Sequence, residues 1–430
     1  MPTVAFHTLG CKVNQYDSQA MLELFEQAGY TAVDFSEPAD VYVVNTCTVT
    51  GTGDKKSLQA VRRAQRQNPS AQVVIAGCLA QRDGEKLLET GARLVIGNAR
   101  RKEVVTLLEE AVEKGQQVAA VENILRTPYE PLSITRHEGH TRAVLKIQEG
   151  CDRYCTYCII PSVRGGIRSR RPEEVGREAQ RLSEAGFSEI VLTGIHLTSY
   201  GRDLGDRTLL DAVRACDALP RVRRIRLGSL EPVIVTEQFV NALRQTKVCP
   251  QFHLALQSGS DTVLKRMRRR YTAEEFRRAC ALMRQAFPGC AITTDVICGF
   301  PGETEEEYQQ TVDFCREIGF ARLHVFPYSA RQGTPAAAMP HPVPKAVREE
   351  RARRLIAVGK EMADTYRQAQ VGKTVQVLAE ECAGGIASGY TAEYMPCAFP
   401  GGMPGNLYDV LATGVSGDGL TGRIITPEAH

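Results

Sequence analysis

The sequence lacks any long apolar run. No stretch of its 430 residues approaches the roughly 18 uncharged apolar residues that a membrane-spanning helix needs. The first residues, MPTVAF, contain no basic stretch ahead of an apolar segment, which is how a secretory signal begins. We therefore expect no membrane partner and a cytoplasmic location.

The sequence also has little excess charge of either sign. It carries 53 Lys and Arg against 50 Asp and Glu, a formal net charge of +3. So small an excess does not indicate a nucleic-acid partner by itself, and any such indication must come from how the charges are distributed.

Cysteine, by contrast, is abundant, with 14 residues. In a long chain without a signal sequence, cysteines serve metal or redox chemistry more often than a disulfide framework. We expect reduced thiols, some of them acting as ligands.

The first part of the sequence alternates short apolar runs with amphipathic segments. Such alternation indicates parallel strands with helices on the faces of the sheet. The expected strands are Thr3 to Thr8, Val41 to Asn45, Val73 to Ala76 and Leu94 to Ile96, and the expected helices are Ser18 to Ala28, Ser57 to Arg66 and Gly84 to Thr90. The polar, proline-containing segment Thr127 to His140 is typical of a linker, so the first domain is predicted to span residues 1–126.

Six further apolar or β-branched runs follow, separated by helix-compatible stretches. The pattern predicts a partial βα barrel over residues 141–344. Its expected strands are Ala143 to Ile147, Glu189 to Leu192, Arg224 to Leu227, Phe252 to Leu256, Ile292 to Ile297 and Leu323 to Phe326. A charged helix over residues 345–370 and a glycine-rich, β-leaning tail over 371–430 come next. The predicted fold is α/β: an open parallel α/β sheet domain, a TIM-like partial barrel and a small β-barrel.

Three cysteines share one loop directly after the first predicted barrel strand: Cys151, Cys155 and Cys158. The carboxyl end of a strand is where βα barrels carry their chemistry. A 4Fe-4S cluster takes four thiolates, so three of them leave one iron open to a small-molecule ligand. A structural zinc site is the main alternative, but it needs four protein ligands, and the nearest histidines, His137, His140 and His196, form no spaced pair. Three buried packing cysteines are a second alternative.

Three more cysteines each follow a predicted strand of the first domain: Cys11, Cys47 and Cys78. Open α/β sheets gather ligands at the carboxyl edge, so three distant cysteines with this placement can converge there. A single cysteine after a strand is more often a small buried hydrophobe, and the shared placement of all three weakens that alternative.

The loop from Cys151 to Cys158, with Tyr157 before the last cysteine, resembles the signature of the radical S-adenosylmethionine superfamily over about residues 143–330. The resemblance implies that S-adenosylmethionine chelates the open iron and is cleaved to a 5′-deoxyadenosyl radical, while the protein holds the cofactor in place. Residues at later strand ends are then expected to contact it, because glycine allows close backbone approach and Ser or Glu can bind polar groups. With Tyr157, these residues are Thr193, Gly194, Ser229, Glu231, Gln257, Ser258 and Gly299. Ordinary turn residues are the alternative for each.

Longer segments resemble the methylthiotransferases: HTLGCKVNQYDS at residues 7–18, NTCTVT at 45–50, AGC at 76–78, QEGC at 148–151 and IPSVRG at 160–165. This resemblance covers nearly the whole chain. It implies a second 4Fe-4S cluster on Cys11, Cys47 and Cys78, involved in supplying sulfur, and a C-terminal RNA-binding β-barrel of the TRAM type.

The form LGCKVNQY at residues 9–16 most resembles the branch that acts on threonylcarbamoyladenosine in tRNA. The resemblance thus implies addition of a methylthio group to C2 of N6-threonylcarbamoyladenosine beside the anticodon. S-adenosylmethionine would be both methyl donor and radical source, with a flavodoxin-type protein as reductant. The alternatives are the same chemistry on isopentenyladenosine in tRNA or on a ribosomal-protein aspartate and, from another class, a zinc-stabilised RNA-binding protein without catalysis.

Basic residues form three clusters: Lys265, Arg266, Arg268, Arg269 and Arg270; Arg221, Arg223, Arg224 and Arg226; and Arg164, Arg168, Arg170 and Arg171. Such clusters suit a phosphate backbone, and the last is placed to meet a carboxylate-bearing substrate near the radical. Solvated helix faces are the alternative for the first two.

The C-terminal tail, residues 371–430, has two basic against six acidic residues and hence a net charge of −4. It cannot attract phosphate through its own field. Either it binds RNA by shape and by stacking on Tyr390, Tyr394 and Phe399, or the barrel and the helix from Lys345 to Gln370 provide the attraction.

Overall fold

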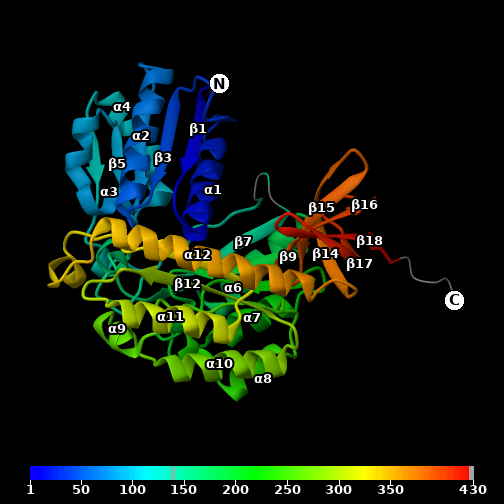
Figure 1. Ribbon diagram of the computed structural model, residues 1–430. Coiled ribbons are helices and arrows are strands. Elements are labelled where there is room, and N and C mark those ends of the chain that lie inside the picture. The colour runs from blue at the N-terminus through cyan, green and yellow to red at the C-terminus, as the bar shows by residue number, and fades with distance from the viewer. Residues whose placement is uncertain (137–138, 140, 426–430) are drawn as a thin grey trace.

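The computed structural model describes residues 1–136, 139 and 141–425. Its N-terminal part is a parallel sheet in the order β2-β1-β3-β4-β5-β6. The strands are β1 (Thr3–Thr8), β2 (Thr31–Val33), β3 (Val41–Thr46), β4 (Gln72–Gly77), β5 (Leu94–Ile96) and β6 (Val118–Ala120). Figure 1 shows this sheet standing above the rest of the molecule, with helices on both faces.

Two apolar layers cover the N-terminal sheet. On one face, α1 (Lys12–Gln27) and α4 (Val104–Glu113) bury Met21, Phe25, Val104 and Leu108 against it. On the other face lie α2 (Gly51–Gln67), α3 (Cys78–Asp83) and the 3-10 helix η1 (Gly84–Thr90). The layers fix the sheet's carboxyl edge, where the cysteines lie.

The central part is a partial barrel of six parallel strands. They are β7 (Arg142–Glu149), β9 (Glu189–Gly194), β10 (Arg224–Leu227), β11 (Gln251–His253), β12 (Ala291–Cys298) and β13 (Arg322–Pro327), with the short antiparallel β8 (Arg168–Ser169) at one edge. Single bridges from Ile225 to Val248 and from Leu230 to Leu254 join its two halves. The helices are α5 (Ile160–Arg164), α6 (Pro172–Glu184), α7 (Leu209–Asp217), α8 (Glu237–Leu243), α9 (Asp261–Arg266), α10 (Ala273–Ala286), α11 (Glu305–Ile318) and α12 (Lys345–Gln368).

The C-terminal part is a closed five-stranded barrel, β14-β15-β16-β18-β17. Its strands are β14 (Thr374–Ala383), β15 (Ile386–Thr391), β16 (Pro396–Pro400), β17 (Leu407–Ser416) and β18 (Gly419–Ile424). Helix α12 runs across the molecule to reach it (Figure 1). These three parts confirm the predicted fold class. Among the helices of the described residues, none has the length and apolar character of a membrane span.

Several element predictions differ from the structure. The first helix begins at Lys12 rather than Ser18, with Cys11 at its N-cap position. The segment Gly84–Thr90 is a 3-10 helix, and the expected strand Phe252 to Leu256 is only three residues long. Strands β2 and β6 were not predicted, since a three-residue edge strand leaves almost no periodic signal. His137 and His140 lie outside the described residues, as do residues 426–430 of the tail.

A buried ion network joins the N-terminal domain to the partial barrel. It contains Asp17, Arg101, Glu130, Lys146, Glu149 and Arg164. Every one of these side chains is at most 7% exposed, and three cations balance three anions. Burial alone would raise the pKa of Asp17, but the three cations lower it, so this carboxylate stays ionised.

The C-terminal barrel is docked through arginines of the central barrel. Arg226 donates to the carbonyls of Thr391 (2.8 Å) and Ala392 (2.7 Å). Arg142 pairs with Glu380 at 2.8 Å, and its guanidinium lies 4.9 Å from the ring centroid of Tyr394. These contacts hold the small barrel against strands β7 and β10.

Candidate functional site

Cys11, Cys47 and Cys78 lie at one edge of the N-terminal sheet. Strands β1, β3 and β4 are parallel neighbours, and one of these cysteines follows the carboxyl end of each. The chain before Cys11 runs against Cys47: a Cβ on Gly10, whose φ is +104°, would stand 3.2 Å from the Cys47 Sγ. The positive φ and this close approach favour glycine here. Burial raises the pKa of Cys47 to about 11.

Arg164 brings the partial barrel into contact with this edge. Its Nε donates to the Cys78 Sγ at 3.2 Å, and its Nη1 lies 3.1 Å from Asp17. The amide of Asn98 also lies 3.7 Å from the Cys78 sulfur. Fixed donors of this kind stabilise a thiolate, which is the form that binds a metal.

The loop from Cys151 to Cys158 follows β7. The Cys151 N–H donates to the Gly165 carbonyl at 3.0 Å, and a Cβ on Gly150 would stand 1.7 Å from the Gly166 carbonyl oxygen. Only glycine fits this contact, because any larger residue at position 150 would push the loop away from the chain after α5. Burial raises the pKa of Cys151 to about 11 and that of Cys158 to about 12.

A cluster of charged side chains faces these cysteines. Glu231 lies 2.9 Å from Arg269, 3.0 Å from Arg153 and 3.1 Å from the His196 ring. Burial alone would raise the pKa of Glu231, but contact with His196 and the nearby cations lower it to about 2. Arg269 also donates to the Cys155 Sγ at 3.3 Å, which links the cluster to the cysteine loop.

The buried polar atoms of this cluster are paired with one another. Arg153 Nε and His196 Nε2 meet Glu231 Oε2, and Arg269 Nη2 meets Glu231 Oε1. Buried charges are normally paired in this way. A set of buried charged groups beside the cysteines suits a polar, charged ligand such as S-adenosylmethionine.

The predicted ligand residues divide into two groups. Thr193 and Gly194 end β9, Ser229 and Glu231 lie in the loop after β10, and Gln257 lies in the loop after β11. Ser229 is exposed. Gln257 has φ +69°, an uncommon conformation for a non-glycine residue and one that favours a functional role.

The second group also has contacts within the protein, and its part in cofactor binding stays a prediction. Ser258 is wholly buried, and its hydroxyl bonds with Thr311 and the Ser260 N–H. A Cβ on Gly299 would clash with Arg348 of α12, so glycine there serves helix packing. Tyr157 packs edge-on against Phe300, with ring centroids 6.4 Å apart.

The two cysteine sets are joined by one short segment. Ile159 follows Cys158 directly and precedes α5, and Val163 lies within α5. Both pack against Cys78. At the other side, Arg331 of the barrel donates to the Thr48 hydroxyl at 2.9 Å and pairs with Asp54, both close to Cys47. The two sites therefore face one another across the domain interface.

Within the described ranges, no three His, Cys, Asp or Glu side chains are close enough to hold a single metal ion. A 4Fe-4S cluster differs, because each thiolate binds a different iron and the sulfurs stand further apart than around one ion.

The three predicted clusters of basic residues are only partly available to solvent. Their exposed members are Lys265, Arg268, Arg270, Arg221, Arg223 and Arg171. Arg164, Arg168 and Arg170 are buried in internal contacts, and Arg224 and Arg226 are each 2% exposed and hold the C-terminal barrel. Arg269 belongs to the cysteine site. Phosphate cannot reach these buried side chains, so a contact of the clusters with an RNA backbone stays a prediction for their exposed members alone.

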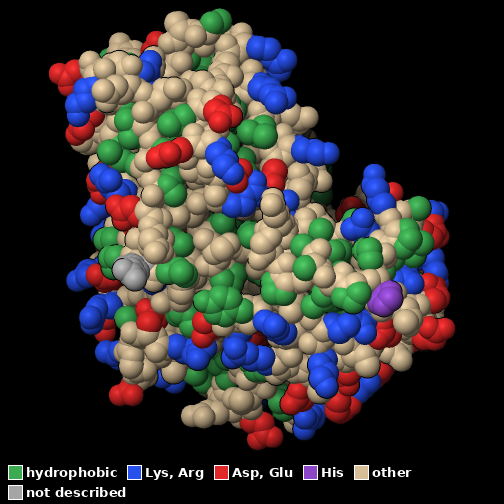
Figure 2. Space-filling view, turned by 90° about the vertical axis from the view of Figure 1, so that its left-hand side faces the viewer, with side chains coloured by type: hydrophobic (Ala, Val, Ile, Leu, Met, Phe, Trp, Pro, Cys, Tyr) green, Lys and Arg blue, Asp and Glu red, His purple; other side chains and the backbone are tan. Residues whose placement is uncertain are grey.

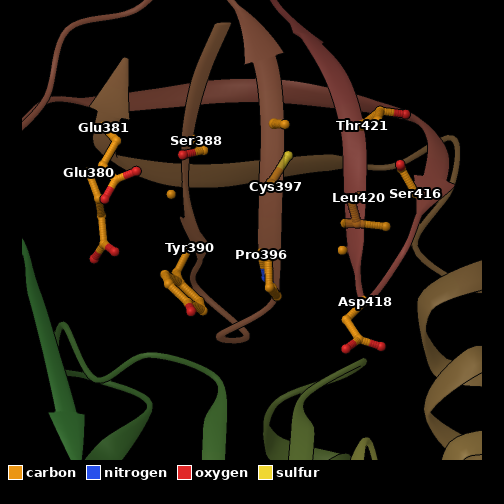
Figure 3. Close-up of a pocket in the computed structure, with 13 residues that line it drawn as sticks. Glu380, Glu381, Ser388, Tyr390, Pro396, Cys397, Ser416, Asp418, Leu420 and Thr421 are labelled. Atoms are coloured by element: carbon orange, nitrogen blue, oxygen red, sulfur yellow. The ribbon is translucent and has the colours of Figure 1, made fainter. Parts of the chain in front are cut away.

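The predicted stacking residues of the tail are also occupied. Tyr390 and Tyr394 stack on each other at 4.8 Å, and Phe399 is buried. A pocket of about 440 Å³ lies on this barrel (Figure 3). Carboxylates of Glu380, Glu381 and Asp418 line it without any Lys or Arg, so it does not suit phosphate.

The sequence reasoning missed polar residues inside the partial barrel. His253 lies 3.3 Å from Asp295, and the rings of His253 and His324 are 5.9 Å apart. Their strand neighbours Ile292, Val296 and Val325 belong to the apolar core between the strands and the surrounding helices. Because side chains alternate along a strand, the polar set faces the inside of the barrel. The alternation of polar and apolar residues along β12 and β13 was the available signal. Arg153 and His196 gave none, because each depends on contacts distant in sequence.

Two family models match the chain: the uncharacterized protein family UPF0004 over residues 3–97, and the radical SAM superfamily over residues 145–315. A Bacillus subtilis (strain 168) protein named threonylcarbamoyladenosine tRNA methylthiotransferase MtaB is 46% identical, over 93% of this chain and 91% of its own. A Parafrankia sp. (strain EAN1pec) protein named tRNA-2-methylthio-N(6)-dimethylallyladenosine synthase is 41% identical, over 87% of this chain and 77% of its own.

Among solved structures, the radical S-adenosylmethionine methyltransferase TsrM from Kitasatospora setae, with cobalamin and a [4Fe-4S] cluster bound, aligns with a TM-score of 0.58. The alignment covers 90% of this chain and 80% of that one, at 16% sequence identity. At that identity the likeness supports the fold alone.

Proposed function

The chain belongs to the radical S-adenosylmethionine methylthiotransferases, and from that premise we propose that it adds a methylthio group to C2 of N6-threonylcarbamoyladenosine in tRNA. The observation that carries the proposal is the near full-length match to the threonylcarbamoyladenosine enzyme of Bacillus subtilis, at 46% identity over 91% of that protein. The dimethylallyladenosine relative from Parafrankia aligns over less of its length. Since tRNA is the substrate, we place the enzyme in the cytoplasm.

We assign one 4Fe-4S cluster and S-adenosylmethionine to the barrel site. Cys151, Cys155 and Cys158 are its ligands, and Arg269 donates to the Cys155 sulfur. Glu231 and Gln257, with Thr193, Gly194 and Ser229, would bind polar groups of S-adenosylmethionine. The buried charged groups beside the loop, Glu231 with Arg153, His196 and Arg269, support this assignment.

A second 4Fe-4S cluster is assigned to Cys11, Cys47 and Cys78. In support, the three thiols share one sheet edge, and Arg164 donates to Cys78 from the facing domain. When bound, the barrel cluster supplies the electron that cleaves S-adenosylmethionine, and the N-terminal cluster supplies the site where sulfur is methylated before insertion.

The residues of the chain have their own tasks in this scheme. Arg164 and Arg269 donate to the Cys78 and Cys155 sulfurs, and Glu231 is held ionised by its cationic neighbours. Inside the barrel, His253, Asp295 and His324 offer hydrogen-bonding groups to the hydroxyl and carboxylate of the threonylcarbamoyl group. Each of these side chains is fixed by another protein contact, which favours a preorganised site.

We propose a division of labour among four segments. Residues 1–126 carry the sulfur-supplying site, 141–344 the radical site, and 345–370 a connecting helix, while 371–430 form a TRAM-type module. A flavodoxin-type protein would supply electrons.

The decisive experiment compares modified nucleosides of tRNA from a strain lacking this chain with those of the complemented strain by mass spectrometry. We expect loss and recovery of the methylthio derivative of threonylcarbamoyladenosine alone. Loss of the isopentenyladenosine derivative, or of the methylthio group on a ribosomal-protein aspartate, would assign the chain to another branch.

A further inference from the structure

Helix α2 carries exposed cations without ion pairs. Lys55, Lys56, Arg62 and Arg66 are exposed, and none of them forms an ion pair within the described part of the chain. Near Cys47 and Cys78, by contrast, Arg82, Arg164 and Arg331 are ion-paired. Lys265, Arg268 and Arg270 form a second exposed set, beside the barrel cysteines. Figure 2 shows basic and acidic side chains intermixed over one face of the molecule. The cations of α2 are therefore singled out by their lack of ion pairs and not by a local concentration of positive charge.

The four cations lie along the outward side of the helix. Ser57, Ala60, Val61 and Ala64 are its buried residues. At 3.6 residues per turn, Lys55, Arg62 and Arg66 fall on the line opposite that buried face, and Lys56 flanks it. Lys55 and Arg66 are separated by about 16 Å along the axis at 1.5 Å per residue, the rise of roughly five stacked nucleotides.

The helix begins at the cysteine sites. Asp54, next to Lys55, pairs with Arg331 of the barrel and lies 2.8 Å from Arg82. The Cys47 N–H donates to the Ser57 hydroxyl at 3.3 Å. A nucleotide held between the two cysteine sets would thus have its flanking strand beside the first turn of α2.

We propose that Lys55, Lys56, Arg62 and Arg66, here named the α2 basic stripe, bind the phosphate backbone of the tRNA anticodon arm. The inference rests on the proposed function, since it takes tRNA as the substrate. Charge complementarity supports it, because the C-terminal barrel is acidic and Arg224 and Arg226 of β10 are buried beneath it. The stripe supplies affinity and orientation, not base recognition.

The test compares two variants of the anaerobically reconstituted full chain. One is K55Q/K56Q/R62Q/R66Q. The control, R181Q/R214Q/R244Q/R278Q, removes four exposed cations of the barrel's outer helices that belong to none of the basic clusters, and it changes the formal charge equally. Binding of tRNA from the deletion strain is measured at several salt concentrations.

We expect the stripe variant to bind tRNA roughly ten-fold or more weakly than the wild type. If each of the four cations contacts one phosphate, the slope of log K against log salt should fall in magnitude by up to about 3.6, at about 0.9 per contact. The control should match the wild type, and both variants should form 5′-deoxyadenosine without RNA. A milder R62Q/R66Q variant should lose about half of the slope change. A stripe variant that binds like the control would overturn the inference, whereas wild-type chain without salt-dependent tRNA binding would overturn the proposed function as well.

Discussion

Replacing Cys11, Cys47 and Cys78 together by Ala separates the two cysteine sites. If each set binds one 4Fe-4S cluster, iron should fall from about eight to about four atoms per chain. The stability cost should be small. Only Cys78 is buried, in contact with Ile159 and Val163, so truncation should cost about 1 kcal/mol of unfolding free energy.

The assay is reduction of the variant with S-adenosylmethionine and substrate tRNA under anaerobic conditions. Formation of 5′-deoxyadenosine should persist, because Cys151, Cys155 and Cys158 are untouched, while no methylthio product should appear. An Ala variant of the buried Cys216, remote from both sites, is the matched control. Full methylthiolation with unchanged iron would refute the reasoning, since the three residues would then be packing cysteines.

Three further predictions follow from the site. Cys155→Ala should abolish formation of 5′-deoxyadenosine, because a lost thiolate distorts the site of the open iron; measurable cleavage, or zinc at the site, would contradict the assignment. Lys146→Met should cost about 3–5 kcal/mol in urea unfolding, because it leaves buried carboxylates unbalanced, and Asp17→Asn in the same chain should reduce that loss. Glu231→Gln should flatten the acid dependence of stability of the cluster-free protein. The folded pKa of Glu231 is about 2 against an ordinary 4.5, so its ionised form stabilises the fold above about pH 4.5, and this is lost as pH falls toward 2.

The placement of strands and cysteines was predictable from the sequence because it rests on local patterns. Arg224–Leu227 was predicted to the residue, and the three N-terminal cysteines follow neighbouring strands as expected. In β4, for example, the valine and isoleucine residues favour a strand, and the glycine before Cys78 marks its end. Both signals are local and do not depend on distant parts of the chain.

The roles of the arginines were not predictable in this way. Arg221 is exposed and Arg226 is buried, although both stand in one basic run, because the carbonyls that accept from Arg226 come from a domain more than 160 positions away. The alternation of Arg224 and Arg226 with Ile225 and Leu227 indicated two faces of one strand. It did not indicate which protein surface would cover the arginine face.

The buried ion network has a consequence for motion. Asp17 and Arg101 belong to one domain and Lys146 and Glu149 to the other, so a shift of one domain against the other would leave buried charges without their partners. This interface resembles a shared core more than a hinge. We therefore expect the distance between the two cysteine sites to stay the same during turnover. The RNA and the small molecules are then expected to move between the sites.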